Sequence, residues 1–170
     1  DKYKEKPGAD SKKVTADEIN ELESMLEEIF FFSLVWSVGC TVDLDGRRKF
    51  NSWLRQTMQA NNQRVGFPES GMVYDYYFSF KNKKYELWTE QNKAYEVDPQ
   101  LSFSEIVVPT NNYTRMLYLM KLMLTNNIHV LCPGPTGTGK SLYADALLTT
   151  SLPEEFQYIS ITFSAQTSGN

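Results

Sequence analysis

The sequence has few of the residues that build metal centres, disulfide frameworks or nucleic-acid surfaces. It contains one histidine and two cysteines in 170 residues, and its 17 basic residues are outnumbered by 21 acidic ones. A net charge of −4 supplies no basic surface of the kind that attracts nucleic acid. Cys40 and Cys132 lie far apart, and neither has a Cys or His cluster around it. We therefore predict two reduced thiols.

Long hydrophobic runs are also missing. The longest apolar run, Ile29–Val38, is far shorter than a membrane span, which needs about 20 residues. No signal segment opens the chain and no internal repeat is present. These absences predict a soluble intracellular protein with neither membrane nor nucleic acid among its partners. Hydrophobic residues still make up 41% of the chain, which is enough to build a packed core.

The N-terminal part reads as a flexible segment followed by two helices. Residues 1–14 are charged and contain Pro and Gly, which predicts a flexible end. Thr15 and Glu18 match a capping box, so a helix is predicted from about Ala16 to Val38. Its inward stripe is predicted to be Ile19, Leu22, Leu26, Ile29, Ser33 and Trp36. A second helix is predicted over about 46–60, with these residues facing inward: Phe50, Trp53, Leu54 and Met58.

Two aromatic, β-prone runs follow the helices. Val73–Phe80 and Tyr85–Thr89 are separated by a four-residue polar connection, a pattern typical of a β-hairpin. Residues 90–100 are polar and predict a connector. Together these segments predict that residues 15–100 form a small helical unit with a β-hairpin.

The C-terminal part, residues 101–170, has the alternating pattern of an α/β fold. Strands are predicted at 105–108, 128–132 and 158–163, with a helix capped by Thr110 between the first two. Another helix is predicted over about 139–149. The fold class is therefore α/β: the helical unit with its hairpin, then the N-terminal part of a three-layer P-loop sheet.

A phosphate-binding loop is the strongest motif in the chain. Residues 134–141 match G-x-x-x-x-G-K-[ST], with an apolar run before the motif and a helix-compatible segment after it. Glycine lets the backbone approach phosphate oxygens, so that the N–H groups of the loop form an anion nest. Lys140 is predicted to reach the phosphates of ATP or ADP, and the Ser141 hydroxyl to bind Mg²⁺. The predicted site comprises Gly134, Pro135, Thr136, Gly137, Thr138, Gly139, Lys140 and Ser141.

Residues for hydrolysis are not evident. An ATPase of this class needs an acidic residue at the end of a later strand. The acidic residues after Ser141 are Asp145, Glu154 and Glu155, and none of them ends an apolar strand. We therefore name no catalytic residue and expect that this chain alone does not hydrolyse ATP. His129, without partners at ligand spacing, is predicted to be a sheet-surface residue.

Several segments, taken in order, resemble dynein heavy chains. Residues 106–110, the helix that contains Arg115, HVLCPGPTGTGKS (129–141) and ITFSAQTSGN (161–170) are similar to the start of the third AAA+ module of that family. FFSLVWSVG (31–39) and FPESGMVYDYYF (67–78) resemble the end of the second module, which implies that residues 15–100 are a lid-linker region between AAA+ modules. The chain departs from the family pattern at Asn111-Asn112, where an acidic residue is expected.

The resemblance implies a piece of an ATP-driven microtubule motor, with the axonemal branch favoured. It implies a regulatory nucleotide site in which Val107, Val108 and Pro109 lie beside the adenine. Implied partners are neighbouring AAA+ modules of the same heavy chain, dynein intermediate and light chains, and microtubules through parts outside this chain. The implied location is the cytoplasm and cytoskeleton, in the axoneme of a cilium or flagellum.

Two other hypotheses remain open at this point. The chain could be a stand-alone P-loop kinase or GTPase, although the segment after the loop supplies few strands for such a fold. It could also be a non-enzymatic structural fragment between modules, in which the loop has no bound nucleotide.

Overall fold

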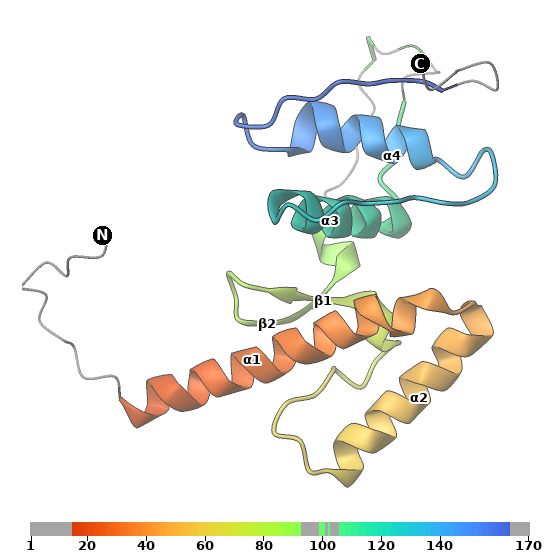
Figure 1. Cartoon of the computed structure of the whole chain (residues 1–170). Helices are drawn as coiled ribbons and strands as arrows, with labels where there is room; N and C mark the ends of the chain where they lie inside the picture. The colour runs from red at the N-terminus through yellow and green to blue at the C-terminus, as the bar shows by residue number, and fades with distance from the viewer. Residues whose placement is uncertain (1–14, 93–98, 101, 103–105, 164–170) are drawn as a thin grey trace, which may run out of the picture. The chain divides into compact units, whose positions relative to one another are not determined.

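The computed structural model describes residues 15–92, 99–100, 102 and 106–163. Two compact units are distinguished, Asp1–Trp88 and Thr89–Asn170 (Figure 1). The predicted flexible segment 1–14 and the middle of the predicted connector, 93–98, lie outside the described residues. Each unit is described by itself below.

Helix α1 (Ala16–Ser37) begins where the capping box predicts. The Thr15 hydroxyl accepts a hydrogen bond from the Glu18 N–H at 3.3 Å, and the Glu18 carboxylate accepts one from the Thr15 N–H at 2.8 Å. These two bonds satisfy N–H groups that a helix start leaves without partners. The helix ends two residues before Gly39, where a short 3₁₀ turn (Gly39–Thr41) starts the corner toward the next helix. The predicted bounds are confirmed.

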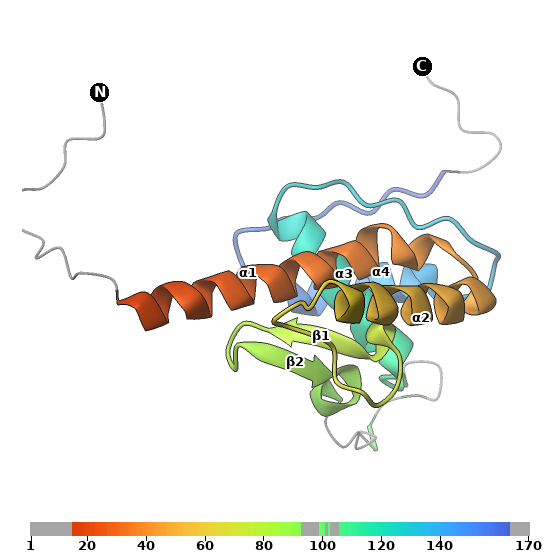
Figure 2. The same cartoon turned by 90° about the horizontal axis from the view of Figure 1, so that it is seen from below.

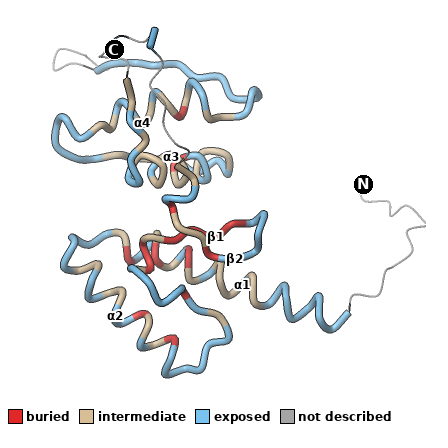
Figure 3. The backbone as a smooth tube through the Cα atoms, turned by 180° about the vertical axis from the view of Figure 1, so that it is seen from behind, coloured by how far each residue is buried: buried red, intermediate tan, exposed pale blue. Residues whose placement is uncertain are grey.

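The predicted inward face of α1 is wrong over its first half. The buried residues of the helix are Phe32 and Val35, whereas Ile19, Leu22 and Leu26 are exposed. Figure 3 shows the same contrast, with the N-terminal turns of α1 coloured as exposed and its later turns against the hairpin. Helical periodicity identifies a stripe but not what covers it, and here the hairpin lies against a different face of the helix.

By length and composition, α1 with its following turn is the one described helix that could cross a membrane. The core helix of a soluble protein passes the same test. The later turns of α1 bury Phe32 and Val35 inside this unit.

Helix α2 (Leu44–Ala60) is capped by Asp43, whose carboxylate accepts the Gly46 N–H at 2.8 Å. Leu54 and Met58 are buried as predicted and Phe50 is half-buried. Trp53 is exposed, so its predicted inward orientation is wrong. Because Trp53 directly precedes Leu54 on the helix, the two side chains point in directions about 100° apart.

The predicted hairpin is present. Strands β1 (Tyr76–Ser79) and β2 (Lys84–Leu87) pair antiparallel, with Tyr76 opposite Leu87 and Ser79 opposite Lys84. The lead-in residues Val73–Asp75 form a 3₁₀ turn instead of the first part of the strand. This is the only sheet in the described part of the chain.

Aromatic side chains with hydrogen-bonded polar groups connect this hairpin to the helices. The Tyr74 hydroxyl donates to the Gly39 carbonyl at 2.6 Å, and the Trp88 indole N–H donates to the Tyr74 carbonyl at 3.1 Å. The Tyr85 hydroxyl donates to the Glu28 carbonyl of α1 at 2.6 Å. Burial, with the Glu28 charge nearby, raises the pKa of Tyr85. The phenol therefore keeps the proton with which it bonds α1.

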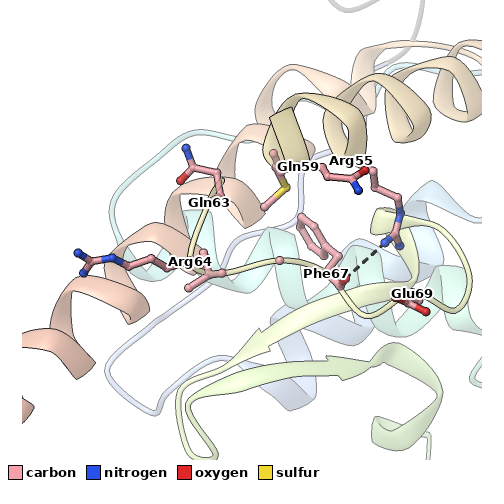
Figure 4. Close-up of a pocket in the computed structure, with 9 residues that line it drawn as sticks. Arg55, Gln59, Gln63, Arg64, Phe67 and Glu69 are labelled. Atoms are coloured by element: carbon pink, nitrogen blue, oxygen red, sulfur yellow. Dashed lines mark hydrogen bonds between the residues drawn. The ribbon is translucent and has the colours of Figure 1, made fainter. Parts of the chain in front are cut away.

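Arg55 of α2 organises the loop that returns from α2 to the hairpin. Its guanidinium donates to the carbonyl groups of Phe67, Pro68 and Gly71 at 3.3, 2.8 and 3.2 Å. Figure 4 shows this side chain above the loop, beside a groove of about 410 Å³. Since Arg55 donates to three backbone carbonyls and to the Asn51 side chain, we assign it a structural role in that groove.

The second unit contains two α-helices in its described residues. Helix α3 (Asn111–Thr125) is capped by Thr110, as predicted, and α4 (Lys140–Ala146) continues into a π-helical turn (Leu147–Ser151). The α3 side chain Met120 is buried, and so is Leu147, which follows α4.

The three predicted parallel strands are not found among the described residues of 106–163. The backbone at 106–108, 128–132 and 158–163 has no sheet partner, and Glu105 lies outside the description. Leu131 is 88% exposed and Ile159 is 87% exposed. An isolated strand has no partner for its backbone groups, so an apolar run alone does not form a sheet. The fold is confirmed only as helices plus an antiparallel hairpin.

The Arg55 contacts give a stability prediction. Arg55→Met should lower the free energy of unfolding of the first unit by about 1–3 kcal/mol, because three loop carbonyls lose a charged donor. Urea unfolding followed by tryptophan fluorescence measures it, since Trp36, Trp53 and Trp88 all belong to this unit. The control is Arg48→Met, whose exposed pair with Asp45 should contribute less than about 0.5 kcal/mol. Equal effects of the two changes would contradict the assignment.

Candidate nucleotide site

The loop before α4 has the backbone conformation that its glycines allow. Gly137 has φ +77° and Gly139, the N-cap of α4, has φ +80°. Residues with a Cβ rarely adopt these left-handed values. The Gly139 carbonyl accepts the Tyr143 N–H at 2.9 Å, which is the first hydrogen bond of the helix. The loop thus turns directly into the N-terminus of α4, the positive end of a helix dipole.

Lys140 places its ammonium group back over this loop. Its Nζ donates to the Pro135 carbonyl and to the Thr138 hydroxyl, the latter at 3.2 Å. The Thr138 hydroxyl also donates to the Pro135 carbonyl at 3.0 Å. The charged end of Lys140 is therefore held at the loop. In this position it faces the place where the loop N–H groups would bind an anion.

Tyr143 supports the site from the first turn of α4. A Cβ at Gly139 would lie 3.3 Å from the Tyr143 ring, so the ring packs close to the backbone there. The same ring makes an edge contact with Tyr113 of α3, with centroids 5.6 Å apart. These two tyrosines connect the loop to α3. Sequence reasoning did not select Tyr143; an aromatic residue four positions after the last loop glycine was the available signal.

The predicted residues occupy different surroundings. Residues 134–138 and Ser141 are exposed, whereas Gly139 and Lys140 are half-exposed. Val107 and Pro109 are half-buried and Val108 is exposed, on the segment that enters the Thr110 cap of α3. Their position beside an adenine stays a prediction. His129 is exposed on a segment without sheet pairing, so its predicted place on a sheet surface is not confirmed.

A second polar cluster lies at the start of α3. The Asn92 side-chain amide donates to the Asn111 side chain at 2.7 Å, and the Thr114 hydroxyl donates to Asn92. The sequence predicts no role for Asn111 and predicts only that Asn92 belongs to a connector. The cluster fixes the residues around Thr110, the cap that follows Pro109.

The loop fits a phosphate group better than a metal ion alone. The described residues contain no group of three or more His, Cys, Asp or Glu side chains that could hold a metal. The loop itself offers N–H groups, the Lys140 ammonium and the Ser141 hydroxyl. With this set, Mg²⁺ would be held jointly by the hydroxyl of Ser141 and by phosphate oxygens. Cys40 and Cys132 are free thiols in this structure.

Both parts of the chain match models of known protein families. Residues 95–170 match the family described as "P-loop containing dynein motor region", which defines the class of this part as a P-loop motor domain. Residues 2–90 match "Dynein heavy chain AAA lid domain". The chain therefore belongs to the dynein heavy chain family.

Individual relatives agree with this family. Over 94% of its own residues, this chain is 37% identical to mouse dynein axonemal heavy chain 1. Over 83% of its own residues, it is 39% identical to human dynein axonemal heavy chain 12. It is 35% identical to mouse dynein axonemal heavy chain 2 over 86%. It spans only 3 to 5% of the length of these relatives.

The two left-handed glycines should differ in their tolerance of a side chain. Gly137→Ala meets no atom within 4 Å, so its cost is backbone strain of about 1–2 kcal/mol. Gly139→Ala has a comparable strain and also presses its Cβ against the Tyr143 ring. Amide hydrogen exchange should therefore show a greater loss of protection in α4 for Gly139→Ala. Equal protection in the two variants would contradict the proposed packing of Tyr143.

Proposed function

We propose that this chain is a nucleotide-binding piece of a dynein motor ring, with Gly134–Ser141 as its phosphate loop. The observation that carries the proposal is the Lys140 ammonium held over the loop at the N-terminus of α4. On ATP or ADP binding, phosphate oxygens would replace the Pro135 carbonyl and Thr138 hydroxyl as its partners. The family match to a P-loop motor region supports this reading.

The α/β sheet expected around the loop belongs to the same proposal. The exposed apolar segments at 128–132 and 158–163 have the composition of buried parallel strands. We propose that further segments of a longer heavy chain pair with them. The small share of each relative that this chain spans supports this view.

The role in the parent protein is proposed to be regulatory. The described residues after Ser141 contain Asp145, Glu154 and Glu155 and no acidic residue at the end of a strand. This piece would therefore bind nucleotide without hydrolysing it, and other modules of the heavy chain would be its direct partners. Microtubules and intermediate and light chains would be reached through other parts of the protein. The axonemal names of the relatives support a location in cilia or flagella.

The proposal is tested by calorimetric titration of the chain with Mg-ATP and Mg-ADP. Lys140→Ala should weaken binding by about ten- to a hundredfold, because one charged hydrogen bond is removed. Lys121→Ala, on an exposed position of α3 in the same unit, is the matched control and should bind as the wild type does. Far-UV circular dichroism checks that each variant is folded.

Two results would contradict the phosphate-loop assignment. One is equal affinity of Lys140→Ala and Lys121→Ala for both nucleotides. The other is a folded wild-type chain that binds neither nucleotide, which would favour the alternative of a structural piece between modules.

A further inference from the structure

An apolar stripe on α1 is not covered by the described residues of the first unit, 15–88. Its members are Ile19, Leu22, Leu26 and Phe30, which are 47%, 54%, 66% and 60% exposed. In both ribbon views the N-terminal turns of α1 extend beyond the hairpin and α2 (Figures 1 and 2). Four large apolar side chains in a row on one helix are a contiguous patch and not scattered surface residues.

The spacing of this stripe selects a helix as the partner. Its four residues are separated by three, four and four positions, so they lie on one side of α1 along about 17 Å of helix axis. This is the spacing at which the ridges of one helix fit the grooves of another. A strand, whose side chains repeat every two residues, does not match it.

The negative charge of α1 indicates that the residues flanking the apolar face of that partner are basic. The helix contains six acidic residues and no Lys or Arg: Asp17, Glu18, Glu21, Glu23, Glu27 and Glu28. Glu18 and Glu23 flank Leu22 at the positions that face a partner across a helix pair. The pairs of Glu21 with Lys83 and Glu23 with Arg64 have exposed side chains, and they leave the helix strongly negative.

We propose that this α1 stripe binds an amphipathic helix whose apolar residues follow the same spacing and whose flanking residues are Lys or Arg. A second copy of the chain is disfavoured because it would bring the same carboxylates against this face. An anionic membrane is disfavoured for the same reason. The residues of this stripe belong to the first unit, whereas the phosphate loop belongs to the second.

The test uses the full chain and a designed, fluorescently labelled helical peptide. The peptide has about three heptads with Leu and Ile on one side and Lys at the flanking positions, and its matched partner has Glu there. Fluorescence anisotropy should show at least about tenfold tighter binding of the Lys peptide, with the difference reduced at high salt. The double variant Leu22→Gln/Leu26→Gln should bind the Lys peptide at least about tenfold more weakly.

The control is Leu44→Gln, which makes the same chemical change at an exposed leucine of α2 outside the stripe. It should bind the Lys peptide as the wild type does. The single variant Leu26→Gln, at the most exposed stripe position, provides a milder change if the double variant shows altered tryptophan fluorescence.

The following outcomes would overturn the proposal. Equal binding of the Lys and Glu peptides would remove the charge argument, and unchanged binding by the stripe variants would remove the surface. Self-association in sedimentation that the stripe variants abolish would assign the face to a second copy. Binding to phosphatidylcholine vesicles that these variants abolish would assign it to a lipid surface.

Discussion

The first unit depends on one buried hydrogen bond, from the Tyr74 hydroxyl to the Gly39 carbonyl. Tyr74 is almost fully buried, and a phenol hydroxyl without a partner there would cost about 1–3 kcal/mol. The acceptor lies at the corner where α1 gives way to the path toward α2. The Tyr74 carbonyl in turn receives the Trp88 indole N–H, so one residue links the helical corner to the end of the hairpin.

The second unit buries few of its described apolar residues. Helix α3 is capped by Thr110, and Met120 and Leu147 are buried, yet the apolar segments at 128–132 and 158–163 are largely exposed and have no sheet partner. A P-loop is defined by a turn between a strand and a helix, and here the helix and the turn are present without the sheet. Local bonds such as that from Tyr143 to Gly139 are sufficient to form the turn, whereas a parallel sheet requires several strands that are distant in sequence.

What the sequence predicts correctly is therefore local. The Thr15 and Thr110 caps, the ends of α1 and α3 and the hairpin at Tyr76–Leu87 follow from short-range patterns and are confirmed, whereas α4 ends at Ala146, before the predicted end near 149. The exposure of Leu22 and Trp53 was missed, because periodicity does not say which face a partner covers. The predicted strands failed for the related reason that pairing depends on other segments. At the site, the motif identified Lys140, but the contact between Tyr143 and Gly139 depends on tertiary packing.

Helix α1 also has a mechanical consequence. Its 22 residues extend about 33 Å, and the Tyr85 bond at Glu28 holds it to the hairpin beyond its midpoint. The preceding turns are joined to the rest of the unit by the exposed ion pairs of Glu21 with Lys83 and Glu23 with Arg64, and Ile19 lies about 14 Å from the Tyr85 bond. A sideways force of a given size at Ile19 exerts a torque on the hairpin in proportion to this length. A force on the N-terminal turns of α1 would consequently be transmitted to the aromatic residues of the core as a torque on the hairpin.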